Sequence, residues 1–194
     1  MKNRLVGRVL MAMVLTAGMA DMARAELITF DEFSGSFQGP APFTSGSLTF
    51  SSSSNIVGVW TFPPDVGAYN GTPYLLDGFS GLLTISRTDS TPFVLSSFDI
   101  ALGWFQPGTN LNMDITYFLN GGGTASGVLP LTLAYQNFSP GLSVTSVQFD
   151  ISDSPNGYIS LDNIEIAEVP EPSTLLLLGT GLLAGARRLR RRRA

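Results

Sequence analysis

The side chains of this chain that could do chemistry are its carboxylates. The 194 residues include no His and no Cys, so the chain lacks the commonest general base, the commonest transition-metal ligand and any thiol. A Ser-His-Asp hydrolase and an ordinary zinc hydrolase are therefore excluded within this chain. Paired carboxylates can hydrolyse glycosides without His, but no spacing among the 15 acidic residues singles out an acid and a nucleophile. We expect no enzyme, and a secreted carbohydrate-active enzyme that uses acidic residues is the alternative.

Aromatic side chains are the second group to consider, because a flat ring can stack on the C–H face of a sugar. The candidates for such stacking are Trp60, Trp104, Tyr69, Tyr74 and Phe105. Trp104 falls on the apolar face of its segment, so we expect it in the core, and Phe105 points the other way and is the better candidate. Tyr69 and Tyr74 flank Asn70-Gly71, which we interpret as a hairpin turn. Each ring taken singly is more often packing than ligand binding.

Charge divides the chain into three parts. Four of the 11 basic residues precede Glu26 and six lie in the last eight residues, which leaves only Arg87 in 26–168. That middle part holds 13 acidic residues, so its net charge is −12. Such a domain repels phosphate backbones, and we expect no nucleic-acid partner.

The first part, residues 1–25, has the pattern of a secretory signal peptide. Three basic residues precede an apolar run at 9–20, and Ala23 and Ala25 are small residues of the kind that signal peptidase requires. We expect signal peptidase to cut after Ala25, so that the mature chain begins near Glu26. Cleavage after Ala20 and a retained anchoring helix are the weaker alternatives, since the apolar run is too short to span a bilayer.

The last part, residues 169–194, combines three features in order. It contains the motif Val169, Pro170, Glu171 and Pro172, then an apolar stretch at 173–186, then Arg187, Arg188, Arg190, Arg191, Arg192 and Arg193. As a helix the apolar stretch is about 21 Å long, short of the ~30 Å hydrocarbon core. The arginine stems can reach a lipid interface, and the charges stay on the cytoplasmic side. We therefore expect a short transmembrane helix that holds residues 26–168 outside the inner membrane.

This tail resembles the PEP-CTERM sorting signal, which has the same three features at the end of the chain. The resemblance implies processing by an exosortase, an integral-membrane Cys protease of Gram-negative bacteria that make exopolysaccharide, with Pro170, Glu171 and Pro172 as the recognition motif. It implies a protein that crosses the inner membrane, is anchored there transiently, and then reaches the cell surface or the extracellular exopolysaccharide of a biofilm. The scissile bond does not follow from the resemblance, and a plain single-span anchor is the alternative.

The middle part reads as strands, because period-two alternation recurs and no stretch keeps a helical period. We predict strands at 27–30, 48–51, 55–62, 82–86, 93–104, 111–119, 128–133, 142–151 and 158–166. Turn signals separate them, among them Asn70-Gly71, Asp77-Gly78 and 121–123. The predicted fold class is all-β, an antiparallel β-sandwich or jelly-roll domain at 26–168, between an N-terminal signal helix and a short C-terminal membrane helix.

Alternation also predicts which side chains face inward. In 93–104 the shared apolar face is Val94, Phe98, Ile100, Leu102 and Trp104, and in 111–119 it is Leu111, Met113, Ile115, Tyr117 and Leu119. Two strands change phase, one near Ser146 and the other at Asp162-Asn163. We predict a β-bulge at Asp162-Asn163, because one extra residue there returns the apolar residues to the same face.

The middle part also resembles PEP-CTERM ectodomains, and its closing segment at 161–166 is similar to the last strand of jelly-roll carbohydrate-binding modules. The resemblance implies a structural calcium at Asp31 and Asp162, whereas hydrogen bonds within turns and bulges are the alternative role of these residues. Two carboxylates do not make a calcium site, so we expect no cofactor. We expect a non-enzymatic surface or exopolysaccharide-associated protein, with carbohydrate binding and a structural matrix or adhesion role both open.

Overall fold

A computed structural model describes residues 24–39, 42–54, 57–61, 67–78, 81–104, 112–150, 157–169, 179 and 181, without the side chains of 37–39 and 104. The chain divides into two compact units, of which one is Ala25–Glu168 and the other combines Met1–Arg24 with Val169–Ala194. The expected signal helix and the apolar stretch of the tail fall outside the described residues, apart from 179 and 181. Within the described part, no helix is both long enough and apolar enough to cross a membrane.

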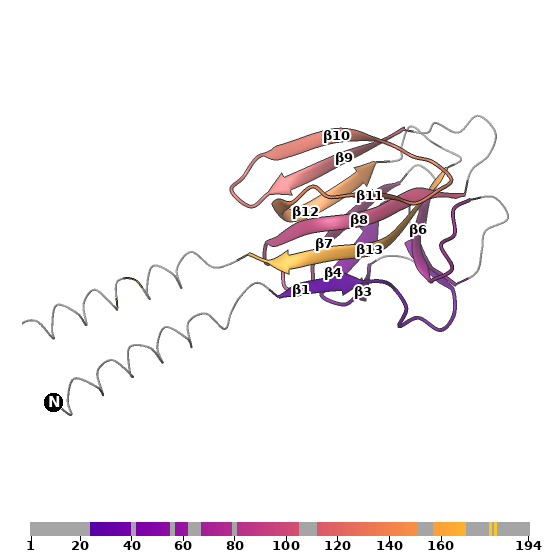
Figure 1. Cartoon of the computed structure of the whole chain (residues 1–194), viewed down its shortest axis with the longest axis horizontal. Coiled ribbons are helices and arrows are strands. Elements are labelled where there is room, and N and C mark those ends of the chain that lie inside the picture. The colour runs from indigo at the N-terminus through magenta and orange to yellow at the C-terminus, as the bar shows by residue number, and fades with distance from the viewer. Residues whose placement is uncertain are drawn as a thin grey trace, which may run out of the picture. The chain divides into compact units, whose positions relative to one another are not determined.

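The unit Ala25–Glu168 is built from antiparallel strands (Figure 1), which confirms the predicted fold class. Its strands are β1 (Ala25–Ile28), β2 (Phe37–Gly39), β3 (Phe43–Ser45), β4 (Leu48–Ser52), β5 (Val57–Trp60), β6 (Tyr74–Gly78), β7 (Leu82–Arg87), β8 (Phe93–Trp104), β9 (Asn112–Leu119), β10 (Thr124–Pro130), β11 (Gln136–Phe138), β12 (Leu142–Asp150) and β13 (Tyr158–Glu168). The short strands and frequent turns follow from the high Gly, Pro and Ser content.

The strands form the two layers of a sandwich. One layer runs β2-β5-β6-β13-β8-β11, with β1 beside β13, and the other runs β10-β9-β12-β7-β4-β3. Strand pairing joins the layers where residues 142–144 of β12 pair with residues 93–95 of β8, before β12 continues in the second layer. One apolar cluster fills the space between the layers, and its largest fully buried side chains are Phe30, Phe50, Phe93, Phe98 and Phe149.

The predicted bulge at Asp162-Asn163 is confirmed. Asp162 pairs with Asp99 and Glu165 pairs with Ser97, so β13 carries one extra residue there relative to β8. Asn163 has φ of 50°, a left-handed conformation that Asn adopts more readily than most residues. The pairing of β12 with β9 also shifts, between Val144 and Ser146, where the sequence changes phase.

Other sequence predictions were wrong. On β8, Phe93 and Leu95 are buried and Val94 is only half-buried, because one extra residue between Leu95 and Ser97 shifts the alternation. Asp77-Gly78 is no turn but the buried end of β6. β6 is buried on both faces and so shows no alternation, and β2, β3 and β11 have only three residues each.

The inward face of β9 is confirmed for Met113 and Ile115, which are buried, while Leu111 lies outside the described residues.

Candidate functional site

The outer surface of the first layer carries an aromatic cluster that is separate from the main core. Tyr74, Leu76 and Tyr158 are buried there, and the half-buried Trp60 packs against them. Trp60 and Tyr74 are direct partners in the pairing of β5 with β6. A Cβ atom on Gly78 would lie 2.1 Å from Cδ1 of Tyr158, so this glycine leaves the space that the Tyr158 ring occupies.

Tyr69 extends this cluster toward solvent. The residue is 37% exposed, and the centroid of its ring lies 6.0 Å from that of Tyr74 in an edge-to-face arrangement. The segment that carries Tyr69 is held on the layer by a hydrogen bond from the Ala68 N–H to the Leu102 carbonyl. An exposed tyrosine ring with a fixed backbone is a surface on which a planar apolar face can stack.

Polar side chains continue from Tyr69 across the neighbouring strands. The Asn70 amide donates a hydrogen bond of 2.7 Å to Oδ2 of Asp162, and the Thr72 hydroxyl donates one of 3.0 Å to the same atom. The other oxygen of Asp162 accepts a hydrogen bond of 2.8 Å from the backbone N–H of Asn163. The buried Asp162 carboxylate therefore fixes the loop at 70–72 onto β13.

The bulge residue carries this polar chain onward to β8 and β11. The Asn163 amide donates a hydrogen bond of 2.8 Å to one oxygen of Asp99, and the exposed Asn137 amide donates one of 2.8 Å to the other oxygen. We call the residues Trp60, Tyr69, Asn70, Thr72, Tyr74, Asp99, Asn137, Asp162 and Asn163 the aromatic–polar face. Rings lie at one side of this face and fixed amides and carboxylates at the other.

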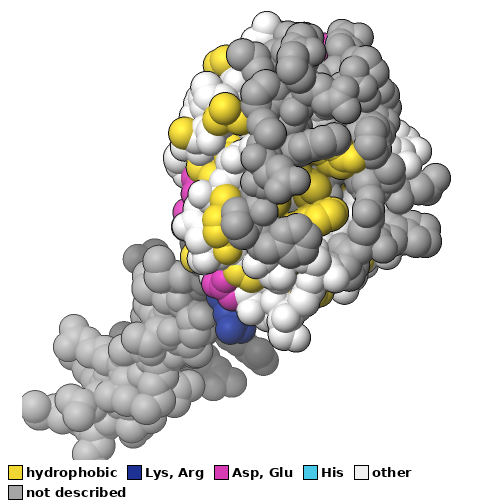
Figure 2. All heavy atoms as spheres, turned by 90° about the vertical axis from the view of Figure 1, so that its right-hand side faces the viewer, with side chains coloured by type: hydrophobic (Ala, Val, Ile, Leu, Met, Phe, Trp, Pro, Cys, Tyr) yellow, Lys and Arg dark blue, Asp and Glu magenta, His cyan; other side chains and the backbone are white. Residues whose placement is uncertain are grey.

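Burial shifts the pKa values of two groups on this face, Asp162 and Tyr74. It raises the pKa of Asp162, and the hydrogen bonds from Asn70, Asn163 and Thr72 act in the opposite direction. Burial, with a smaller contribution from Tyr69, raises the pKa of Tyr74 to about 12. Arg87 is the one Lys or Arg in 26–168, and its guanidinium lies 3.4 Å from Asp89. Figure 2 shows one small dark blue patch beside an acidic one, and the described basic side chains are the exposed Arg24 and the half-buried Arg87.

The structure separates the aromatic residues singled out from the sequence. Tyr69, Tyr74 and Trp60 come together, although Tyr74 is only 1% exposed and so offers no free ring. The Trp104 side chain and Phe105 lie outside the described residues. Asn70-Gly71 lies in the long connection from β5 to β6, so the prediction of a hairpin turn there was wrong.

Asp31 and Asp162 are the two acidic residues for which calcium binding was considered. The contacts of Asp162 fit the alternative, in which the carboxylate accepts hydrogen bonds from a bulge and a loop. Its oxygens accept hydrogen bonds from the bulge and from the loop at 70–72. Asp31 is exposed, and its charge contributes to the raised pKa of Asp162. The described residues contain no group of three or more acidic side chains that could hold a metal ion.

Sequence reasoning missed Asn137 and Tyr158 as members of this region. Asn137 lies on the three-residue strand β11, which is too short to show a period, and Tyr158 owes its position to the space above Gly78. Asp99 lies between the buried residues Phe98 and Ile100, so alternation alone places it on the outer surface.

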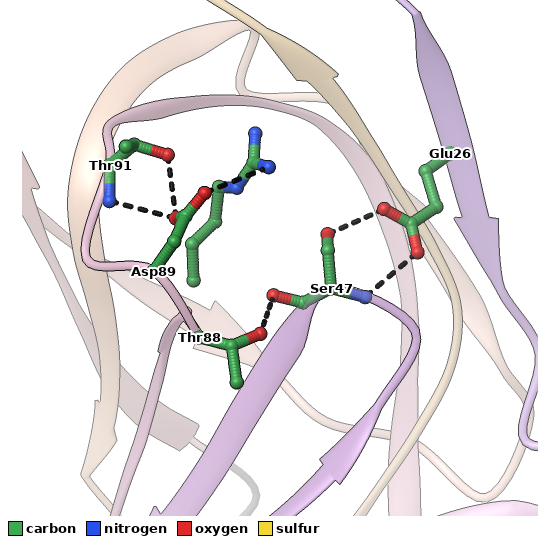
Figure 3. Close-up of polar contacts among 6 residues, drawn as sticks. Glu26, Ser47, Thr88, Asp89 and Thr91 are labelled. Atoms are coloured by element: carbon green, nitrogen blue, oxygen red, sulfur yellow. Dashed lines mark hydrogen bonds and ion pairs between the residues drawn. The ribbon is translucent and has the colours of Figure 1, made fainter.

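A second region of interest is the end of the sandwich at which both chain extensions begin. β1 and β13 pair there, with Ala25 opposite Ala167 and Glu26 opposite Ile166. Figure 3 shows the Glu26 carboxylate accepting hydrogen bonds from the backbone N–H of Ser47, at 2.8 Å, and from the Ser47 hydroxyl, at 2.5 Å. Val169 follows β13 directly and is half-buried, whereas Ala23, Pro170–Pro172 and the six arginines lie outside the described residues.

Residues 168–193 match the family model of the PEP-CTERM protein-sorting motif. The chain therefore carries a PEP-CTERM sorting motif in its C-terminal segment. The motif marks this PEP-CTERM protein as an exported one with a C-terminal sorting signal, and implies an exosortase as its processing partner. No curated protein matches it.

Several solved structures resemble this PEP-CTERM protein distantly. A family 29 carbohydrate-binding module has a TM-score of 0.43 and 12% sequence identity, with 79% of this chain and 98% of the module covered. A variant of the module CBM29-2 in complex with mannohexaose has a TM-score of 0.42 and 12% identity, with 75% and 92% covered. Similarity at this level identifies no ligand for the present chain.

Proposed function

We propose that this PEP-CTERM protein is a non-enzymatic, exosortase-processed surface protein whose sandwich binds a carbohydrate on the aromatic–polar face. Signal peptidase removes residues 1–25, and the apolar stretch with its arginines anchors the sandwich of 26–168 in the inner membrane. Exosortase then cuts in or near 169–172 and delivers the sandwich to the cell surface or the exopolysaccharide.

The boundary between fold and motif supports the processing step. β13 ends at Glu168, and the family match to the sorting motif begins at that same residue. A cut after Glu168 therefore leaves every strand of the sandwich intact. The expected product is a complete folded domain without either terminal segment.

The observation that carries carbohydrate binding is the exposed Tyr69 ring beside the Asn70 amide, which Asp162 holds in place. Sugars present an apolar C–H surface and a rim of hydroxyl groups, so they need a ring to stack on and fixed donors and acceptors. Asn137 and Asp99 supply further polar groups on the same face, and their mutual hydrogen bond fixes their orientation. Side chains that are already ordered lose less entropy when a ligand binds.

Two experiments test this proposal. The protein is expressed in two hosts, one with and one without an exosortase. Intact mass and fractionation should show a form without residues 1–25 and without the tail only in the host that has the protease. A full-length tail in both hosts, with the protein held in the inner membrane, would contradict the processing.

Affinity electrophoresis of the processed protein in gels that contain neutral polysaccharides tests the binding. We expect Tyr69→Ala and Asn137→Ala to weaken retention at least tenfold. Val128→Ala on β10 is the matched control, because Val128 is 61% exposed and lies in the other layer. Retention that is absent for every glycan, or unchanged in Tyr69→Ala, would contradict binding at this face and leave the structural matrix role.

A further inference from the structure

The strand that precedes the sorting motif lies inside its sheet rather than at an edge. β13 pairs with β8 from Tyr158 opposite Trp104 to Glu168 opposite Phe93, with an interruption at the bulge of Asn163. Its other edge is covered first by β6, at 158–161, and then by β1, at 164–167. Figure 1 shows β13 between β8 and β1. Residues 165–167 of β13 therefore have strand partners on both sides, and Ala167 lies two residues before Val169.

Little chain is available between this paired strand and the apolar stretch. Only residues 169–172 separate Glu168 from Ser173, where the apolar stretch begins. Fully extended, these four residues reach at most ~14 Å. Extended peptides are commonly bound by strand pairing with the receiving protein, which requires free backbone N–H and C=O groups. Upstream of Val169 those groups are already used within the sandwich.

The end of β13 is also held by its side chains and by β1. Ile166 is 1% exposed and belongs to the main core, and Ile28 of β1 is 3% exposed and lies opposite Ile164. β1 is in turn fastened to the turn between β3 and β4 by the two hydrogen bonds from Ser47 to Glu26 (Figure 3). Release of the end of β13 therefore requires breaking its contacts with both β8 and β1.

We infer that detachment of residues 166–168 from β8 and β1 limits exosortase cleavage of this chain, so that the folded sandwich slows its own sorting. This inference rests on the processing proposed above. Cleavage is fast while the sandwich is still open, and in the folded protein it proceeds through local fraying of this strand end. The first and last strands of the domain thus set the rate at which the tail is removed.

The decisive test is a spacer in the full-length chain. Four Gly/Ser residues inserted between Glu168 and Val169 supply free backbone without touching the sandwich, and pulse–chase in an exosortase host should show at least fivefold faster cleavage. The matched control is the same insertion in the turn at 121–123, which is exposed and far along the chain from β13. An unchanged or slower rate with the spacer at 168–169 would overturn the inference.

Two core truncations separate local release from global unfolding. Ile28→Ala loosens β1 next to β13, whereas Met113→Ala removes a comparable buried side chain from β9 in the other layer. We expect Ile28→Ala to accelerate cleavage more than Met113→Ala, and the spacer to abolish that difference. Equal acceleration by both would overturn local release. No cleavage of any variant would overturn the proposed processing itself, which is a distinguishable result.

Discussion

Ala25 and Ala167 face each other as direct partners in the antiparallel pairing of β1 with β13. The expected signal-peptidase site after Ala25 and the sorting motif at Val169 therefore begin at the same end of one strand pair. β1 is the first strand of the sandwich along the chain and β13 the last, so their pairing closes the longest loop in the fold. Because such distant contacts form late, the sandwich is complete only when the whole of 26–168 is available.

The Glu26 carboxylate should contribute measurably to the stability of this strand pair. Glu26→Ala removes two charge-assisted hydrogen bonds from Ser47 and leaves the Ser47 N–H without that partner. We expect a loss of about 1–3 kcal/mol in the free energy of unfolding. Urea denaturation of the processed protein, followed by tryptophan fluorescence, measures it. Asp114→Ala, at an exposed site on β9, is the control and should change the free energy little. Equal losses in both variants would contradict a specific role for Glu26.

The bulge at Asn163 should tolerate glycine but not deletion. Deleting Asn163 moves Ile164 and Ile166, each 1% exposed, toward the outer surface of the sheet, and we expect no folded protein. Asn163→Gly keeps the positive φ of 50° and loses only the hydrogen bond to Asp99, a cost of about 1–2 kcal/mol. Thermal unfolding by circular dichroism measures both changes. A deletion variant that melts like the wild type would contradict the bulge.

The bulge could be predicted because β13 has buried residues on one face before and after it. Leu161 and Ile164 differ by three positions, which alternation alone cannot place on the same face. The sequence of β8 contains no comparable signal. Phe93, Val94 and Leu95 are all apolar, so either the odd or the even residues of this segment could face inward. The chosen parity placed Val94 inward, and only the pairing with β13 shows the extra residue between Leu95 and Ser97.

The aromatic–polar face was only partly accessible from sequence. Exposed tyrosines could be nominated from their turn-like neighbours, and Tyr69 is exposed whereas Tyr74 is buried. The contact of Asn70 with Asp162 joins residues 92 positions apart, and no local pattern predicts that distance. Asp77-Gly78 looked like a turn because both residue types favour turns, but burial in a central strand overrode that preference.

The buried Asp77 should make the sandwich less stable as pH rises. Asp77 is fully buried, and its Oδ2 atom has no hydrogen-bond partner among the described residues. Burial raises its pKa from 3.8 to about 6, and the hydrogen bonds from Ser52 and Ser54 offset this only in part. Since the folded-state pKa lies above the unfolded one, the stabilising contribution is full below pH ~4 and is lost as pH rises through ~6.

Asp77→Asn should remove this loss, because an amide remains neutral throughout. We expect the variant to gain about 2–3 kcal/mol relative to the wild type between pH 4 and pH 7, as a shift of two pKa units implies. Urea denaturation at a series of pH values measures the difference. The exposed Asp114→Asn is the matched carboxylate-to-amide control, and an identical pH profile for Asp77→Asn and the wild type would show that Asp77 does not titrate in this range.

The charge of the domain predicts which glycans the aromatic–polar face accepts. Residues 26–168 carry a net charge of −12, and Arg87, their one basic residue, is paired with Asp89. The face itself holds the carboxylates of Asp99 and Asp162, and no Lys or Arg exists in 26–168 that could pair with a uronate or sulfate group at the face. An acidic polysaccharide would therefore meet like charges, with a repulsion that weakens as salt screens it.

We expect neutral polysaccharides to be retained in affinity electrophoresis at low ionic strength and alginate, an acidic polysaccharide, not to be retained. Asp99→Asn is the informative variant, because it removes one charge and keeps one acceptor oxygen for Asn137 or Asn163, and it should narrow the difference in retention between neutral and acidic glycans. Stronger binding of alginate than of neutral glycans at low salt would show that the ligand binds elsewhere than on this face.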